Sequence, residues 1–270
     1  MAHARRPRSY GRPQNDRGRR RAQAWPRRRR GAAMTIPVVI CGRGGRMSRL
    51  ISKAVHEAAG MRLCGYLSPS GPHGPIDGAS VAGELAAFAL PIPVVVDFTH
   101  PSRTARLVEE AAETPCSLVI GTSGLDDGLL ERIAAVACRR ATLVAANFSA
   151  GIDVLRRTAS EFAALRDGHW DASVLDVHFR DKADTPSGTA RMLAEAWSAA
   201  RTKDAPEIDI ASLRLGKGVS EHRLICHGDG EVLELVHRIE NRRAFIAPIL
   251  AAVRFVHEAE AGLYSLEDLR

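Results

Sequence analysis

The sequence predicts an α/β protein: a Rossmann-like parallel sheet with helices on both faces, followed by a second α+β domain with a mostly antiparallel sheet. Two observations lead to this fold class. Between residues 36 and 149, short apolar runs rich in Val and Ile alternate with stretches of helical spacing. This pattern is typical of a parallel sheet that is covered on both faces. After Ser149 the strand-like runs alternate in polarity instead, as antiparallel strands with one open face do.

The first half supplies the elements of the parallel sheet. We expect strands within the apolar runs 36–42, 62–67, 92–99, 117–124 and 142–149. The stretches 46–58, 102–113 and 128–140 have helical spacing. Helices in these positions would carry the chain back over the sheet, so that the successive strands run parallel.

The second half supplies the elements of the other domain. A helix is expected at 151–167 and a strand at 172–179, in which Asp176 and His178 point to one face. Residues 222–238 read as a hairpin around a Gly-Asp-Gly turn. Strands of this kind suggest a sheet with an exposed or oligomer-forming face.

The charge of the chain is distributed unevenly. Twelve arginines and one aspartate lie in residues 1–33, a net of +11, so the remaining chain carries −4 of the total of +7. A segment with so few aliphatic residues is expected to be disordered, and a true start at Met34 would leave it out. Because the chain after residue 33 is acidic, binding to nucleic acid is the least favoured of the possible functions.

The compartment is expected to be the cytoplasm. No apolar run approaches the roughly 18 residues that a membrane span needs, and the arginine-rich start lacks the apolar core of a secretory signal. The five cysteines are scattered and free of CxxC spacing, which suggests free thiols in a reducing compartment. We expect no contact with a membrane.

A glycine-rich segment, CGRGGRM at 41–47, joins the first strand to the first helix. Glycines in this position let the backbone approach a pyrophosphate at the helix N-terminus, although a tight strand–helix connection alone could also explain them. The segments DFTHP, GTSG and AANFS follow three later strands, at the edge where parallel sheets bind ligands. Together the four segments predict a dinucleotide site.

The stretch HFRDKADTPSGTA, residues 178–190, places His178 and Lys182 ahead of a helix that Ser187 would cap. A helix N-terminus favours an anion, and the two side chains add a proton donor and a fixed charge. The alternative is a strand that runs through a solvated loop into an ordinary helix. The other histidines of this half, His222, His227 and His237, have no metal-ligand spacing, and we expect them at the surface or beside the substrate.

Several blocks, in order along the chain, resemble the 4-hydroxy-tetrahydrodipicolinate reductase (dihydrodipicolinate reductase) family of lysine and diaminopimelate biosynthesis. These blocks are GRGGRM, DFTHP, GTSG, AANFSAG, HFRDKADTPSGTA, EHRLICHGDGEVLELVHR and NRRAF. The resemblance covers about residues 36–270, and KADTPSGTA is its most specific part. It implies reduction of a cyclic conjugated imine, 4-hydroxy-tetrahydrodipicolinate, to tetrahydrodipicolinate with NADH or NADPH.

The resemblance also implies how the chain is divided. Residues 34–148 together with 246–270 would form the dinucleotide-binding domain, and residues 149–245 the substrate-binding and oligomerisation domain. The second domain would assemble a homotetramer through its sheet. Residues 1–33 would remain a separate tail.

Site residues are implied in the same way. His178 takes the place of the family's acid/base histidine and Lys182 that of its catalytic lysine. The implied substrate contacts are Phe179, Ser187, Gly188 and Thr189. The implied cofactor contacts are Gly42, Arg43, Gly44, Gly45, Arg46, Met47, Phe98, Thr99, Gly121, Thr122, Ser123, Ala145, Ala146, Asn147 and Phe148. No metal is expected.

Three departures from the family pattern keep alternatives open. Phe179 replaces the second histidine of a His-His pair, Asp176 replaces a glutamate, and Ser68 replaces the acid that binds the adenosine ribose. One alternative is a divergent paralogue that reduces a different cyclic or unsaturated amino acid in a specialised pathway. The other is a nucleotide-binding protein without catalytic activity.

Overall fold

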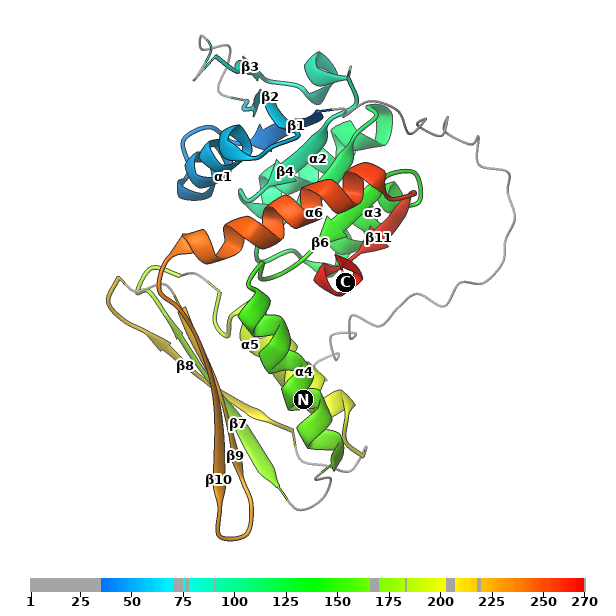
Figure 1. Cartoon of the computed structure of the whole chain (residues 1–270). Helices are drawn as coiled ribbons and strands as arrows, with labels where there is room; N and C mark the ends of the chain where they lie inside the picture. The colour runs from blue at the N-terminus through cyan, green and yellow to red at the C-terminus, as the bar shows by residue number, and fades with distance from the viewer. Residues whose placement is uncertain are drawn as a thin grey trace, which may run out of the picture. The chain divides into compact units, whose positions relative to one another are not determined.

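The computed structural model describes residues 35–69, 75, 78–89, 91–165, 170–182, 184–202, 207–217 and 220–269. The predicted disorder of residues 1–33 concerns a segment outside this set. The compact unit begins at Thr35, and its strands form two sheets (Figure 1). None of the described helices is long and apolar enough to cross a bilayer.

The larger sheet has seven strands, in the order β11-β6-β5-β4-β1-β2-β3, and every neighbouring pair is parallel. Its strands are β1 (Ile36–Cys41), β2 (Met61–Leu67), β3 (Ser80–Ala82), β4 (Val94–Asp97), β5 (Ser117–Ile120), β6 (Ala141–Val144) and β11 (Gly262–Tyr264). The five strands predicted in the first half are confirmed. The edge strands β3 and β11 were not predicted, because three residues are too few to show a period.

Helices cover both faces of this sheet, as predicted (Figure 1). They are α1 (Arg46–Glu57), α2 (Pro101–Glu113), α3 (Asp127–Ala137) and α6 (Ile246–Glu258). Ile51 of α1 and Ile249 of α6 belong to the core on one face, while Leu107 of α2 and Ile133 of α3 belong to the core on the other. The β-branched strand residues are therefore buried from both sides, which explains their continuous apolar runs.

The smaller sheet has the strand order β10-β9-β7-β8. Its strands are β7 (Asp171–His178), β8 (Asp209–Arg214), β9 (Ser220–His227) and β10 (Val232–Ile239). The predicted hairpin is confirmed as the antiparallel pair β9–β10, whose turn contains Gly230 at φ +81°. Strand β8, which pairs parallel to β7, was not predicted.

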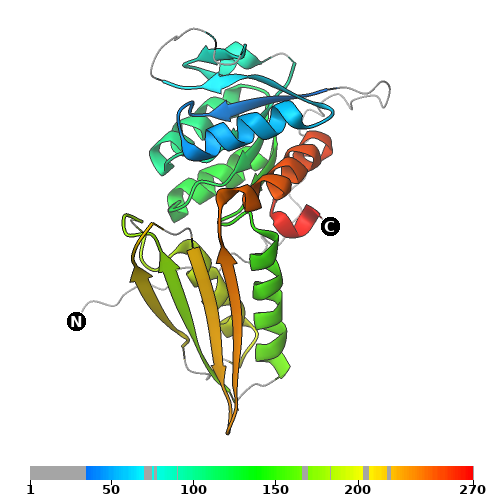
Figure 2. The same cartoon turned by 60° about the vertical axis from the view of Figure 1, so that its left-hand side comes forward.

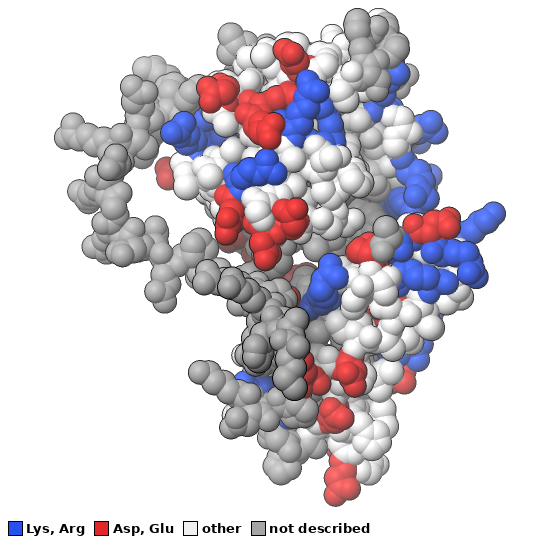
Figure 3. All heavy atoms as spheres, turned by 180° about the vertical axis from the view of Figure 1, so that it is seen from behind, with Lys and Arg blue, Asp and Glu red and all other residues white. Residues whose placement is uncertain are grey.

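Two helices, α4 (Ala150–Leu165) and α5 (Gly188–Ala199), pack on one face of the smaller sheet through a core that includes Trp197 and Leu224. The short helices are η1 (Leu85–Phe88), η2 (Arg242–Phe245) and η3 (Leu266–Leu269). From β10 the chain passes through η2 into α6 and returns to the larger sheet (Figure 2). On the face shown in Figure 3, acidic and basic side chains of the described residues are interspersed over the centre, and basic side chains are frequent along the right-hand edge.

Candidate active site

The turn between β1 and α1 has the shape of a phosphate-binding turn. Gly42 has φ +74°, and a Cβ there would approach Thr99 Cγ2 to 3.1 Å. A Cβ on Gly44 would meet no heavy atom within 4 Å, so this part of the backbone faces open space. Gly45 precedes α1, and no side chain caps the first N–H groups of that helix. These groups therefore remain available to an anion, and the residues fit a dinucleotide pyrophosphate.

A buried carboxylate organises the ends of β4 and β5. Asp97 is fully buried and accepts hydrogen bonds from the backbone N of Thr99 (3.0 Å) and from Oγ1 of Thr104 (2.6 Å). The same N–H of Thr99 also points to Oγ1 of Thr122, 3.1 Å away. Two predicted cofactor segments, DFT and GTS, are thus held together. Asp97 was not among the predicted site residues.

Aromatic packing adds the end of β6 to this group. The rings of Phe98 and Phe148 lie 5.1 Å apart between centroids. A Cβ on Gly121 would come within 2.1 Å of the Phe98 ring, so only glycine fits beside it. The structure therefore brings the predicted segments after β4, β5 and β6 to one edge of the sheet, while Ser123 and Ala146 remain accessible there.

The end of β2 carries no acidic side chain in its described part. Ser68 is buried, and its backbone N donates to the carbonyl oxygen of Ala82 at 2.8 Å. A cavity of about 610 Å³ lies on the α1 side of β2. Its lining is mostly basic and consists of Arg43, Arg49, Ser52, Lys53, His56, Glu57 and Tyr66. Basic groups beside the glycine-rich turn favour an anionic ligand.

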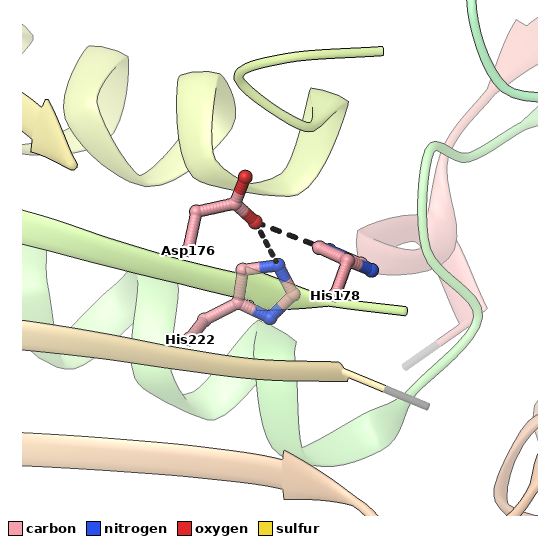
Figure 4. A group of neighbouring side chains, drawn as sticks. All are labelled: Asp176, His178 and His222. Carbon is pink, nitrogen blue, oxygen red and sulfur yellow. Dashed lines mark ion pairs between the residues drawn. The ribbon is translucent and has the colours of Figure 1, made fainter. Parts of the chain in front are cut away.

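The second part of the site is a cluster at the end of β7. His178 is the last residue of that strand, and its Nε2 lies 3.1 Å from Oδ1 of Asp176 (Figure 4). Nε2 of His222, from β9, lies 3.4 Å from the same oxygen. The predicted placement of Asp176 and His178 on one face is confirmed by this contact. The carboxylate is fully buried between the two imidazoles.

Other donors complete the surroundings of Asp176. The backbone N and Oγ of Ser187 donate to it at 3.0 and 2.8 Å, and Arg214 Nη2 lies 3.0 Å from Oδ2. Burial alone would raise the pKa of Asp176, but hydrogen bonds from His178, His222 and Ser187 outweigh it and hold the pKa well below its usual range. Asp176 therefore remains ionised at neutral pH.

The cluster is built for hydrogen bonding. Asp176, His178 and His222 are metal-binding residue types, and their ligand atoms lie within 4.8 Å of one another. Both oxygens of Asp176 already accept from protein donors, and the guanidinium of Arg214 holds one of them. A metal ion would have to displace these donors beside a fixed positive charge, so we interpret the group as a hydrogen-bonded cluster.

Lys182 lies beside this cluster and has a carboxylate partner. Its Nζ is 2.6 Å from Oδ1 of Asp184, whose backbone oxygen accepts from Arg214 Nη2 at 2.6 Å. Burial alone would raise the pKa of Asp184, but the hydrogen bond and the charge of Lys182 outweigh it, so the pKa is lowered. Lys182 is thus held in place by the ionised carboxylate of Asp184, and an anionic ligand would share the lysine with this carboxylate.

The N-terminus of α5 is capped as predicted: Oγ of Ser187 accepts from the backbone N of Ala190 at 3.1 Å. Thr189 is buried, and its Oγ1 accepts from Nδ2 of Asn147 at 3.2 Å. Asn147 belongs to the predicted cofactor residues and Thr189 to the predicted substrate residues. This hydrogen bond joins the two predicted sets.

One alternative predicted for His222 is wrong: the residue does not lie at the surface, because it is fully buried and contacts Asp176. The other alternative, a position beside the substrate, stays a prediction. His222 lies directly opposite Asp176 in the β7–β9 pair, and this pairing could not be read from the hairpin alone. Arg214 and Asp184 were not predicted either. The place of Arg214 depends on the unpredicted strand β8, whereas the KADT motif could have indicated Asp184.

This edge of the larger sheet, with its phosphate-binding turn, has the architecture of a nicotinamide-dependent oxidoreductase, and the imidazole beside it can carry a proton. The sequence models of dihydrodipicolinate reductase match almost the whole described chain, the N-terminal model at residues 36–148 and the C-terminal model at 151–269. The chain belongs to the dihydrodipicolinate reductase family and is an NAD(P)H-dependent oxidoreductase.

Individual relatives agree with this assignment. The 4-hydroxy-tetrahydrodipicolinate reductase of Anaeromyxobacter sp. is 32% identical over 260 residues, which cover 87% of this chain and 97% of the relative. That of Parvibaculum lavamentivorans is 33% identical over 264 residues, covering 87% and 97%. The dipicolinate-bound dihydrodipicolinate reductase of Paenisporosarcina sp. superimposes with a TM-score of 0.70 at 25% identity, covering 88% of this chain and all of that one.

Proposed function

We propose that this protein reduces 4-hydroxy-tetrahydrodipicolinate to tetrahydrodipicolinate in lysine and diaminopimelate biosynthesis. The net reaction consumes one hydride and one proton and releases the 4-hydroxyl group as water. NADH or NADPH supplies the hydride when bound, so the protein itself must bind and orient the substrate and the cofactor and supply the proton. The observation that carries the proposal is the position of His178 and Lys182 beside the capped N-terminus of α5.

The two parts of the chain take separate tasks in this proposal. Residues 34–148 and 246–270 bind the cofactor, and residues 149–245 bind the substrate. The proposed cofactor contacts are Gly42, Arg43, Gly44, Gly45, Arg46, Met47, Phe98, Thr99, Gly121, Thr122, Ser123, Ala145, Ala146, Asn147 and Phe148. The open backbone at Gly44 and the uncapped start of α1 support this assignment.

His178 is the residue that passes the proton in this proposal. Its side chain is only 10% exposed, and its Nε2 lies 3.1 Å from the ionised carboxylate of Asp176, which holds the ring in place. Because Nε2 faces Asp176, Nδ1 is the nitrogen that serves the substrate or a water molecule bound to it. A general acid in this position contributes roughly a hundredfold or more to the rate.

A substrate carboxylate binds at the start of α5. The backbone N–H groups of Gly188 and Thr189 are the first of the helix and point along its positive end. Lys182 adds a charge, because Asp184 holds it nearby. The Paenisporosarcina enzyme has dipicolinate, a dicarboxylate, bound to it, and this supports a dicarboxylate substrate for the present chain.

Steady-state kinetics with substrate prepared in situ, and with each nicotinamide cofactor, test the proposal. His178→Gln and Lys182→Ala should each lower kcat by roughly a hundredfold or more. The control is His227→Gln, because His227 is an exposed histidine on β9. Near-normal turnover of both site variants would contradict the catalytic roles of these two side chains, and no turnover of the unmodified protein would favour a nucleotide-binding role.

Phe179 favours a second candidate, a paralogue with a related substrate. It follows His178 directly and cannot donate the hydrogen bond of the family's second histidine. Losing one such contact to a carboxylate weakens affinity roughly tenfold to a hundredfold. Phe179→His should then recover activity on the standard dicarboxylate. Full activity of the unmodified chain on that substrate would show that Phe179 is a neutral replacement.

We also propose a cytoplasmic homotetramer. The smaller sheet is open on the face away from α4 and α5, where Leu213, Val232 and Val236 are each about half exposed. Apolar side chains in such numbers on one sheet face suit contact with a second copy. Val236→Lys should lower the mass measured by sedimentation, and an unchanged tetramer would exclude this face. All five cysteines are free, which suits a reducing compartment.

A further inference from the structure

The smaller sheet carries a row of polar side chains that crosses its four strands. Asp176 of β7 pairs in register with Ser212 of β8 and with His222 of β9, and His222 pairs with His237 of β10. Contacts run along the row: Ser212 Oγ donates to Asp176 at 3.1 Å, and the rings of His222 and His237 stack with centroids 6.4 Å apart. Beyond the row, His237 Nε2 lies 2.9 Å from Ser149 Oγ.

His222 is held as a neutral imidazole within this row. Burial lowers its pKa, the nearby charges of His178 and Lys182 lower it further, and the hydrogen bond with Asp176 only partly opposes them. Its Nδ1 is buried and has no hydrogen-bond partner among the described residues. A protonated ring would bury an unpaired N–H at that atom, so the proton of the neutral ring belongs on Nε2.

A neutral donor at this place has a consequence for Asp176. Nε2 of His222 and Nε2 of His178 approach the same oxygen, Oδ1, at 3.4 and 3.1 Å. Arg214 lies on the other oxygen, Oδ2. Nε2 of His222 also lies 3.3 Å from Oγ of Ser187, which donates to Oδ1 at 2.8 Å. His222 therefore fixes the direction of Oδ1, directly and through Ser187, without cancelling its charge. A charged imidazole in the same place would compete with His178 for the carboxylate.

We propose that His222 is a positioning residue for His178: it donates from Nε2 as a neutral ring and fixes the Asp176 oxygen that orients the acid. This inference rests on the role proposed above for His178. The charged and titratable groups around His222 are Asp176, His178, Lys182, Arg214 and His237. None of these is exchanged in the variants of His222 that test the proposal.

The ring itself can be observed in the unmodified full-length protein. Nitrogen-15 NMR of histidine-labelled protein distinguishes neutral rings, their tautomers and charged rings, and His222→Gln identifies the His222 signals. We expect a neutral ring with its proton on Nε2 at neutral pH, and a pKa of His222 below the ordinary histidine value of about 6.5. A His222 ring that is charged at neutral pH, or that carries its proton on Nδ1, would overturn the proposal.

Two variants then separate positioning from folding. In His222→Gln the amide nitrogen can reach the place of Nε2, so it keeps a neutral donor, whereas His222→Leu keeps apolar bulk and removes the donor. We expect kcat to fall about tenfold in His222→Leu and at most about threefold in His222→Gln, with KM for the cofactor unchanged in both. Equal losses in the two variants would overturn the role of the donor. If His222→Leu does not fold, the proposal can still be tested with the other protein forms. A charged His222 ring in the unmodified protein, or a loss of kcat much larger than threefold in His222→Gln, would contradict it.

The same NMR spectra keep this inference distinct from the proposed function. In His222→Leu the tautomer or shifts of His178 should change, whether or not His178 acts in catalysis. If His178→Gln remains active but the His178 signals respond to His222→Leu, the acid assignment fails and the contact stands. If His178→Gln is inactive but the NMR signals of His178 do not change in His222→Leu, the positioning role of His222 is wrong and the acid role of His178 stands.

Discussion

His237 Nε2 lies 2.9 Å from the hydroxyl oxygen of Ser149, and the ring occupies the space above Gly151. A Cβ on Gly151 would come within 2.7 Å of His237 Cδ2 and 2.9 Å of Nε2. Gly151 lies in the first turn of α4, where glycine has a low helix propensity. The close approach of β10 to this helix therefore accounts for a residue that the helix alone would not favour.

We expect Gly151→Ala to lower the melting temperature, because the added methyl group must displace the ring and break its contact with Ser149. Overpacking of this kind costs about 1–3 kcal/mol, more than the helix propensity of alanine returns. Thermal unfolding followed by circular dichroism measures the effect. The matched control is Gly128→Ala in the first turn of α3, where the nearest atom would lie 3.6 Å from the new Cβ. A melting temperature of Gly151→Ala equal to or above that of the unmodified protein would show that the His237 ring moves aside without a cost in stability.

Stability should fall on mild acidification. Burial lowers the pKa of His222 and of His237 in the folded protein, so below the unfolded value of about 6.5 the unfolded chain binds more protons. The folded state therefore loses stability as the pH drops through that value, and keeps it above. The melting temperature should fall between about pH 7 and 5, and less steeply in His222→Gln. Parallel curves for the two proteins would exclude a contribution from His222.

Cofactor binding should depend on the absence of a side chain at Gly121. A Cβ there would collide with the Phe98 ring at 2.1 Å and push it from Phe148. We expect Gly121→Ala to weaken NADPH and NADH binding by about tenfold or more, because a small displacement in the loop misplaces several contacts. Titration of cofactor fluorescence measures Kd. Gly128→Ala is the control, because its new Cβ would come no closer than 3.6 Å to another atom and Gly128 is not among the proposed cofactor contacts. Adding Phe98→Leu to Gly121→Ala should restore part of the affinity if the collision is the cause.

Residues 1–33 should be dispensable. Among the described residues the core begins at Ile36, and the N-terminal family model begins at the same residue. A chain that begins at Met34 should keep its melting temperature within about 2 °C and its kcat within about twofold. Loss of cofactor binding in the shortened chain would give the arginine-rich segment a role.

The sequence was sufficient for the parallel sheet, because strands buried on both faces leave long apolar runs and their glycine turns mark the ligand edge. It was also sufficient for the cap of α5, since Ser187 and its hydrogen bond are local in sequence. It did not reveal His222 or Arg214 beside Asp176, because their approach depends on the register of β9 and β8 against β7. Register between distant strands leaves no local signal.

The path of the chain also constrains the order of its synthesis. Ile249 and Val253 of α6 complete the core on one face of the larger sheet, yet they follow the whole smaller sheet along the chain. While the ribosome is still making β7 to β10, the finished strands β1 to β6 lack this helix, and apolar residues such as Val38 and Val96 have only part of their cover. The core of the half that is translated first is thus covered last. Until α6 emerges, the exposed apolar residues of the larger sheet make the growing chain prone to aggregation.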